Sequence, residues 1–128
     1  MAFTRSILKL HLQYRLLISE MNSDITILRI LEDYLKEILL KKSESGIARN
    51  VKYFKNNFAQ FRKENEDLRD KMHLKKMKLF ALLKEKKVLD LKTYRSDNHQ
   101  MILKQFKKYH KNFDKIKNEF SRFVEKRA

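Results

Sequence analysis

The chain contains few residues that could carry out catalysis or bind a metal ion. Its four histidines are His11, His73, His99 and His110, and none lies in an HxxxH or HExxH pattern. Acidic residues cluster between positions 64 and 70, but they lack the Glu-x-x-His repeats with which helical bundles bind iron. There is no cysteine, and a single glycine cannot form a glycine-rich phosphate loop. We therefore expect no catalytic residue, no metal site, no cofactor and no enzymatic activity.

Basic side chains are the abundant chemical group. The chain has 31 lysines and arginines against 16 acidic residues, a formal net charge of +15. Such an excess favours anionic partners, although lysines that only fill solvated faces would give the same composition. Lysine contacts with phosphates do not read base sequence. The candidate anion-binding residues come from the most basic stretch, 71–117, and are Lys71, Lys75, Lys76, Lys78, Lys104, Lys107, Lys108, Lys111 and Lys115.

Positioning these side chains requires long helices. Apolar residues recur at alternating gaps of four and three, which predicts helices over about residues 4–42, 46–91 and 97–127. Proline is absent, and Ser43–Gly46 is the clearest turn. We expect one domain over residues 1–128 with an all-α fold, a long antiparallel three-helix bundle with coiled-coil-like packing. The alternative is a four-helix bundle formed by a break near His73.

Short turns determine which residues lie side by side. A hairpin at Ser43–Gly46 places Asp24 beside Asn65, the polar interruptions of two apolar seams, and a buried polar pair could fix the register. A second turn near Lys92–Asp97 places Phe113 beside Lys75. The third helix would then end level with about Gln60 and leave the hairpin tip uncovered.

An uncovered tip would expose an apolar patch that favours association. We expect a homodimer or a helical protein partner, and the candidate self-association residues are Leu31, Tyr34, Leu35, Ile38, Ile47, Val51, Phe54 and Phe58. The leading hypothesis is a non-enzymatic, self-associating helical protein that acts as an adaptor or scaffold through protein–protein interaction. The alternative is sequence-independent binding of nucleic acid or an anionic surface through the basic end.

Two segments, Val51–Leu68 and Phe113–Val124, resemble helices of small all-helical bacterial proteins. The shared positions are mainly seam aromatics and flanking charges. Since that family has no established activity, the resemblance implies a helical fold and assigns no catalytic or binding residue.

No apolar run approaches the roughly 18 residues of a membrane span, so we expect no transmembrane segment. Residues 1–19 contain Arg5, Lys9 and Arg15 and no acid, a composition found in mitochondrial targeting segments. The four-and-three apolar spacing nevertheless begins within them, which indicates permanent structure. We expect a cytoplasmic protein, with a mitochondrial location as the alternative if residues 1–19 are a targeting segment.

Overall fold

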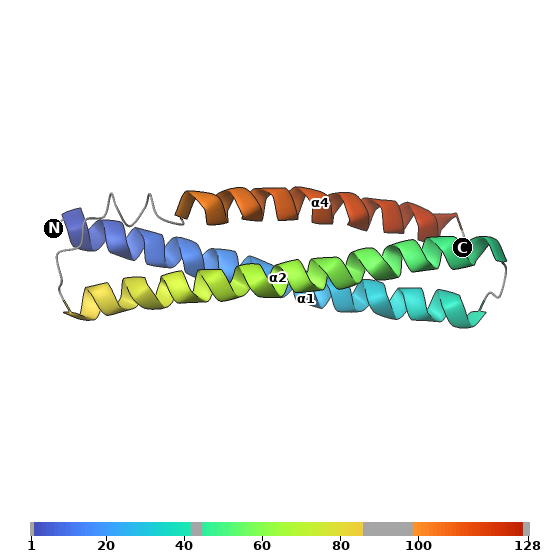
Figure 1. The fold of residues 1–128 in the computed structure, drawn as a ribbon, viewed down its shortest axis with the longest axis horizontal. Coiled ribbons are helices and arrows are strands. Elements are labelled where there is room, and N and C mark those ends of the chain that lie inside the picture. Colours follow the sequence, from blue (N-terminus) through green and yellow to red (C-terminus); the bar gives the residue numbers. More distant parts are fainter. Residues whose placement is uncertain (1, 42–44, 86–98, 127–128) are drawn as a thin grey trace.

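The computed structural model describes residues 2–41, 45–85 and 99–126, which contain three helices and no strand. Helix α1 spans Ala2–Lys41, α2 spans Ser45–Glu85 and α4 spans Gln100–Glu125 (Figure 1). The predicted all-α three-helix bundle is confirmed. The alternative break near His73 is wrong, because α2 continues through that residue. The second predicted turn and the predicted helix ends at 42, 91, 97 and 127 lie outside the described residues.

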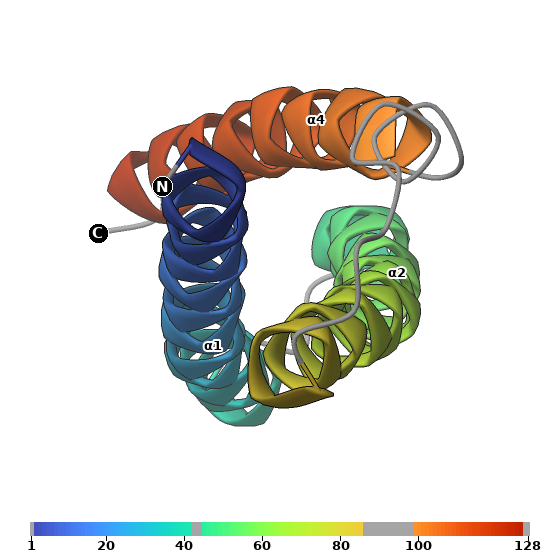
Figure 2. The same cartoon turned by 90° about the vertical axis from the view of Figure 1, so that its left-hand side faces the viewer.

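The core follows the apolar spacing of the sequence. Gaps of four and three keep one side of each helix facing its neighbours, and most of these positions are buried. Viewed from the end, the three helices surround a common interior (Figure 2). The largest fully buried apolar side chains that fill it are Tyr14, Phe58, Phe113, Ile7, Met21, Leu28, Ile47, Met72 and Leu79.

The α1/α2 hairpin has the predicted register. Arg69 Nη1 donates a 2.9 Å hydrogen bond to Asn22 Oδ1, and Arg62 pairs with Glu32. Asn65 lies level with Met21, about one helical turn from Asp24, because its amide donates a hydrogen bond to the Met21 carbonyl. Tyr109 lies beside both Asn65 and Asp24. A short connection leaves two antiparallel helices little freedom to slide, which explains why the sequence sufficed here.

The register of α4 on α2 differs from the prediction. Phe113 packs on Phe61, with ring centroids 5.5 Å apart, and not on Lys75. Lys75 and Phe61 are fourteen positions apart, so α4 lies two heptads, or about 21 Å, further along α2. A shift by whole heptads keeps the apolar seam of α4 against the apolar seam of α2, so the residue spacing alone does not distinguish the two registers. The observed register places the Tyr109 hydroxyl against Asn65, whereas the predicted one placed it against Leu79.

This shift covers the tip of the α1/α2 hairpin. The rings of Phe120 and Phe123 pack on Phe54 at centroid distances of 5.1 and 5.2 Å. The prediction that α4 ends level with Gln60 and leaves the tip bare is therefore wrong. Of the candidate self-association residues, Tyr34 is exposed and Leu31 and Ile38 are half-buried, but the rest are buried within one chain: Leu35, Ile47, Val51, Phe54 and Phe58. Self-association remains a prediction, without the exposed tip from which it was argued.

Candidate anion-binding surface

The outer face of α4 carries a row of basic side chains. Helix α4 buries one face, formed by Ile102, Tyr109, Phe113, Ile116, Phe120 and Phe123. At 3.6 residues per turn, the positions between them project away from α2 into solvent. We call these exposed basic residues the cationic stripe: Lys104, Lys107, Lys108, Lys111, Lys115, Arg122 and Lys126.

Of the three acidic residues of α4, only Glu125 lies within the stripe, between Arg122 and Lys126, and it forms no ion pair with the described residues. Asp114 lies on the flank of the stripe, where Lys117 Nζ approaches Oδ1 at 3.0 Å and His110 Nε2 lies 3.5 Å from Oδ2. Glu119 accepts a 2.7 Å hydrogen bond from the Tyr53 hydroxyl of α2. No stripe side chain forms an ion pair with a residue in the described ranges. The stripe therefore presents unpaired positive charge.

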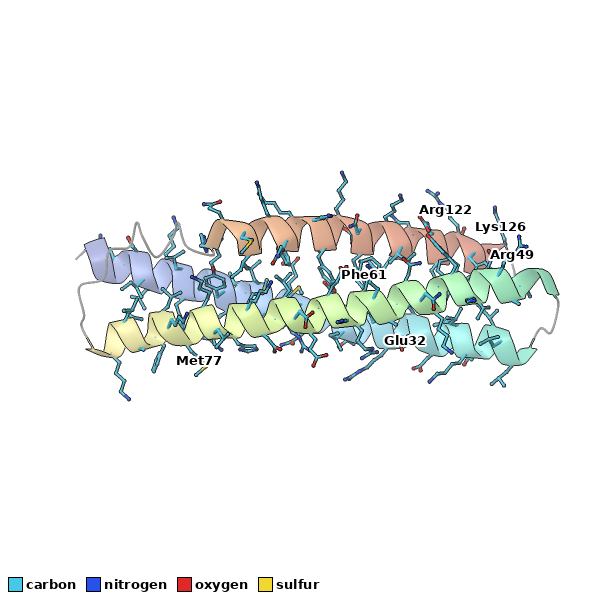
Figure 3. The ribbon with its side chains drawn as sticks, viewed as in Figure 1. Glu32, Arg49, Phe61, Met77, Arg122 and Lys126 are labelled. Atoms are coloured by element: carbon cyan, nitrogen blue, oxygen red, sulfur yellow. The ribbon has the colours of Figure 1, made fainter. Side chains whose placement is uncertain are left out.

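The stripe is long and straight because it lies on one uninterrupted helix. From Lys104 to Lys126 it extends about 33 Å at 1.5 Å per residue. Figure 3 shows Arg122 and Lys126 on the outer side of α4, with Arg49 of α2 near the same end. Arg122 and Lys126 were missed from the sequence, although they follow Lys115 and Arg122 by seven and four positions, at the same helical spacing as the lysines before them.

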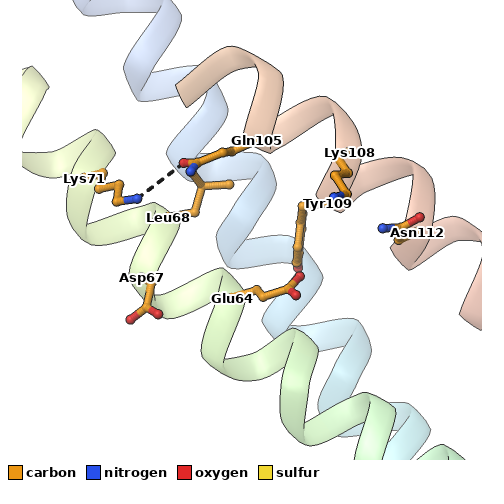
Figure 4. A pocket seen from close by; sticks show the side chains of 8 residues that line it. All are labelled: Glu64, Asp67, Leu68, Lys71, Gln105, Lys108, Tyr109 and Asn112. Carbon is orange, nitrogen blue, oxygen red and sulfur yellow. Dashed lines mark hydrogen bonds between the residues drawn. The ribbon is translucent and has the colours of Figure 1, made fainter. Parts of the chain in front are cut away.

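A groove between α2 and α4 borders the stripe on one side (Figure 4). Glu64 and Asp67 of α2 line it together with Lys71 and Lys108. Lys71 Nζ donates a 3.4 Å hydrogen bond to Gln105 Oε1. Because acids and bases balance in this groove, it is a poor site for an anion, and Lys71 belongs to the groove and not to the stripe.

The other predicted residues on α2 do not join the stripe. Lys75 is 4% exposed in the seam of the bundle, so the prediction that it binds an anion does not fit its burial. Lys76 lies in the groove between α1 and α2, near His11 and Phe80. Lys78 is exposed on α2. The structure thus divides the nine predicted lysines and keeps the five α4 residues together.

A polar layer crosses the bundle interior. Asn65 Nδ2 donates 2.9 Å hydrogen bonds to the Met21 carbonyl and the Tyr109 hydroxyl. Asp24 lies beside the Tyr109 hydroxyl, and burial raises the pKa of both groups. Asp24, Asn65 and Tyr109 are at most 4% exposed, so this layer is closed to a dissolved ligand. Its arrangement fits a structural role in fixing the register.

No protein-family model, curated protein or solved structure matches the chain. Within the described residues, no three histidine or acidic side chains converge as a metal site. No described helix is long and apolar enough to cross a membrane. Among the described residues, the cationic stripe is therefore the feature that best indicates a function.

Proposed function

We propose that this protein is a non-enzymatic helical protein that binds duplex nucleic acid through the cationic stripe, without reading its sequence. The observation that carries the proposal is the row of unpaired basic side chains along the outer face of α4. Each strand of a nucleic acid duplex presents one phosphate per about 3.4 Å of the helix axis. A stripe of about 33 Å therefore spans roughly ten base pairs along that axis.

Residue types in the stripe favour contacts with the phosphate backbone. Six of its seven members are lysines, which act as point charges, whereas base reading uses bidentate side chains such as arginine. Single-stranded nucleic acids are usually held by aromatic side chains that stack on bases. The aromatic residues Tyr109, Phe113, Phe120 and Phe123 are buried on the opposite face of α4. These features support a duplex ligand over a single strand.

The test is titration of a labelled duplex by fluorescence anisotropy at two salt concentrations. The stripe variant replaces four lysines by glutamine: Lys104→Gln, Lys108→Gln, Lys111→Gln and Lys115→Gln. The matched control removes the same charge from exposed lysines elsewhere: Lys36→Gln, Lys52→Gln, Lys55→Gln and Lys63→Gln. Since glutamine and lysine have similar helix propensities, both variants should fold.

We expect the wild-type affinity to fall steeply with salt, with a log–log slope of about −4 if four to five phosphates are contacted. The stripe variant should lose at least tenfold in affinity at low salt, and the control should lose much less. Equal losses in the two variants would show that only net charge matters. Absence of binding at low salt would eliminate the proposal.

A further inference from the structure

A second surface lies at the end of the bundle where α4 has not yet begun. Tyr14 and His99, the residue before α4, are joined by a 2.6 Å hydrogen bond, so α4 starts level with Tyr14 of α1. Along the outside of α1 at this end, Leu8, Leu12 and Leu16 are each more than half exposed. Their spacing of four places them in one row, which we call the leucine row.

Helix α2 extends this apolar surface across a groove. Phe80 and Met77 are 57% and 65% exposed, and the Phe80 ring lies 6.3 Å from the ring of His11. Ala81 lines the same groove. His11 follows Leu8 by three positions, so Leu8 borders this groove, and Leu12 and Leu16 continue the row along α1. We call the leucine row and these α2 residues together the α1/α2 face. Figure 3 shows Met77 directed away from α4, on the side of the bundle opposite to Arg122 and Lys126.

Most charged residues around this face are basic, although Glu20 follows Leu16 by four positions on α1. Residues 5–19 of α1 and 71–84 of α2 contain eight lysines and arginines and no acid. Arg15, Lys76 and Lys84 line the groove itself. Burial, together with nearby Arg15 and Lys76, lowers the pKa of His11, as expected where the local potential is positive. The exposed leucines and phenylalanine thus lie among side chains that are mainly positive.

We propose that this face binds the surface of an anionic phospholipid bilayer, with the leucine row, Met77 and Phe80 inserted at the boundary between headgroups and acyl chains. Helices that lie on membranes combine an apolar face with lysines and arginines that attract anionic headgroups. Both features are present here on folded, packed helices, so binding requires no unfolding.

The same face fits other occupants less well. The phosphates of a nucleic acid could contact the lysines and arginines, but the leucines would remain exposed to water. A second copy of this chain would bring two mainly basic faces together, and like charges would oppose that contact. An acidic helical protein would match the charge and remains an outcome of the experiment. The bilayer is favoured because it supplies both negative charge and an apolar layer beneath it.

The experiment is co-sedimentation with vesicles of phosphatidylcholine, with and without phosphatidylglycerol. The test variant is Leu8→Gln, Leu12→Gln and Leu16→Gln. The matched control is Ile30→Gln and Leu40→Gln, exposed apolar residues of the same helix near its other end. We expect wild type and control to bind the anionic vesicles, and the test variant to bind roughly tenfold or more weakly. Circular dichroism verifies that each variant folds.

A second readout uses the absence of tryptophan from the chain. A Leu12→Trp variant should show a blue-shifted emission with anionic vesicles and no shift with phosphatidylcholine alone, because the indole enters the bilayer boundary. The proposal is overturned if anionic vesicles are not bound at low salt, or if the test variant binds them as wild type does. It is also overturned if the leucine substitutions abolish self-association in lipid-free sedimentation and leave vesicle binding intact, since the occupant would then be a second copy.

This inference stands apart from the proposed nucleic acid binding, because the two faces share no residue. The stripe variant should retain vesicle binding, and the leucine-row variant should retain duplex binding. Failure of one proposal leaves the other intact.

Discussion

Among alanine substitutions of uncharged polar residues, Asn65→Ala should destabilise the bundle most. Asn65 is fully buried, and its amide donates to the Met21 carbonyl and the Tyr109 hydroxyl. Each buried hydrogen bond contributes about 1 kcal/mol net, and the space left by the amide adds to the loss. The Met21 carbonyl would still accept a hydrogen bond within α1, and Asp24 would still lie beside the Tyr109 hydroxyl. We therefore expect a loss of about 2–3 kcal/mol in the free energy of unfolding.

The measurement is urea denaturation followed by helical circular dichroism, with the stability extrapolated to water. Asn56→Ala is the matched control, because Asn56 is exposed on the same helix and should change stability by no more than about 0.5 kcal/mol. A double-mutant cycle with Tyr109→Phe isolates the shared hydrogen bond. The two losses should fall short of additivity by about 1 kcal/mol.

A loss below about 1 kcal/mol for Asn65→Ala would refute this reasoning. So would full additivity with Tyr109→Phe, since it would mean that the two side chains do not interact in the folded protein. Either result would remove the polar layer as the cause of the observed register.

Further tests address the pH dependence, the aromatic packing and the register. Because burial raises the pKa of Asp24, the folded state holds its proton more tightly than the unfolded state, and stability falls as the pH rises through that pKa. Asp24→Asn should therefore be more stable than wild type at pH 7 and lose this advantage below about pH 4, as thermal melts would show. Phe54→Ala should cost about 3–5 kcal/mol in urea denaturation, because four aromatic rings contact Phe54; a loss under about 1 kcal/mol would mean that α4 does not reach the hairpin tip. The chain has no native cysteine, so Lys71→Cys with Gln105→Cys should cross-link through a short bismaleimide, whereas Lys71→Cys with Lys117→Cys should not; the reverse pattern would restore the register predicted from the sequence.

The fold was predictable because its signals are local. Seam spacing, the absence of proline and the turn signal in the sequence Ser43–Gly46 predict two long helices and their antiparallel pairing. The register of α4 on α2 was not predictable, because the apolar seam repeats every seven residues and therefore allows shifts of whole heptads. The register could have been chosen by requiring a hydrogen-bond partner for the buried Tyr109 hydroxyl. Asn65 is the residue at which that requirement is met.

The candidate surfaces were predictable only in part. Lysines 104, 107, 108, 111 and 115 were found from charge density, and their shared outer face follows from helical spacing. Lys75 was misassigned because charge alone does not distinguish a solvated position from a seam position. The leucine row could not be assigned to a surface, because whether α4 covers Leu8 and Leu12 depends on its register.

The position of Met77, on the side of the bundle opposite to Arg122 and Lys126, affects how anionic partners could meet. A duplex on α4 and a bilayer on the α1/α2 face would be separated by about two helix diameters, roughly 20 Å. At 0.1 M salt, electrostatic repulsion decays over about 10 Å. The phosphates of the duplex and of the bilayer would then hardly repel each other, because the bundle holds them further apart than this decay length. Recruitment of labelled duplex to anionic vesicles only in the presence of the protein would reveal such bridging.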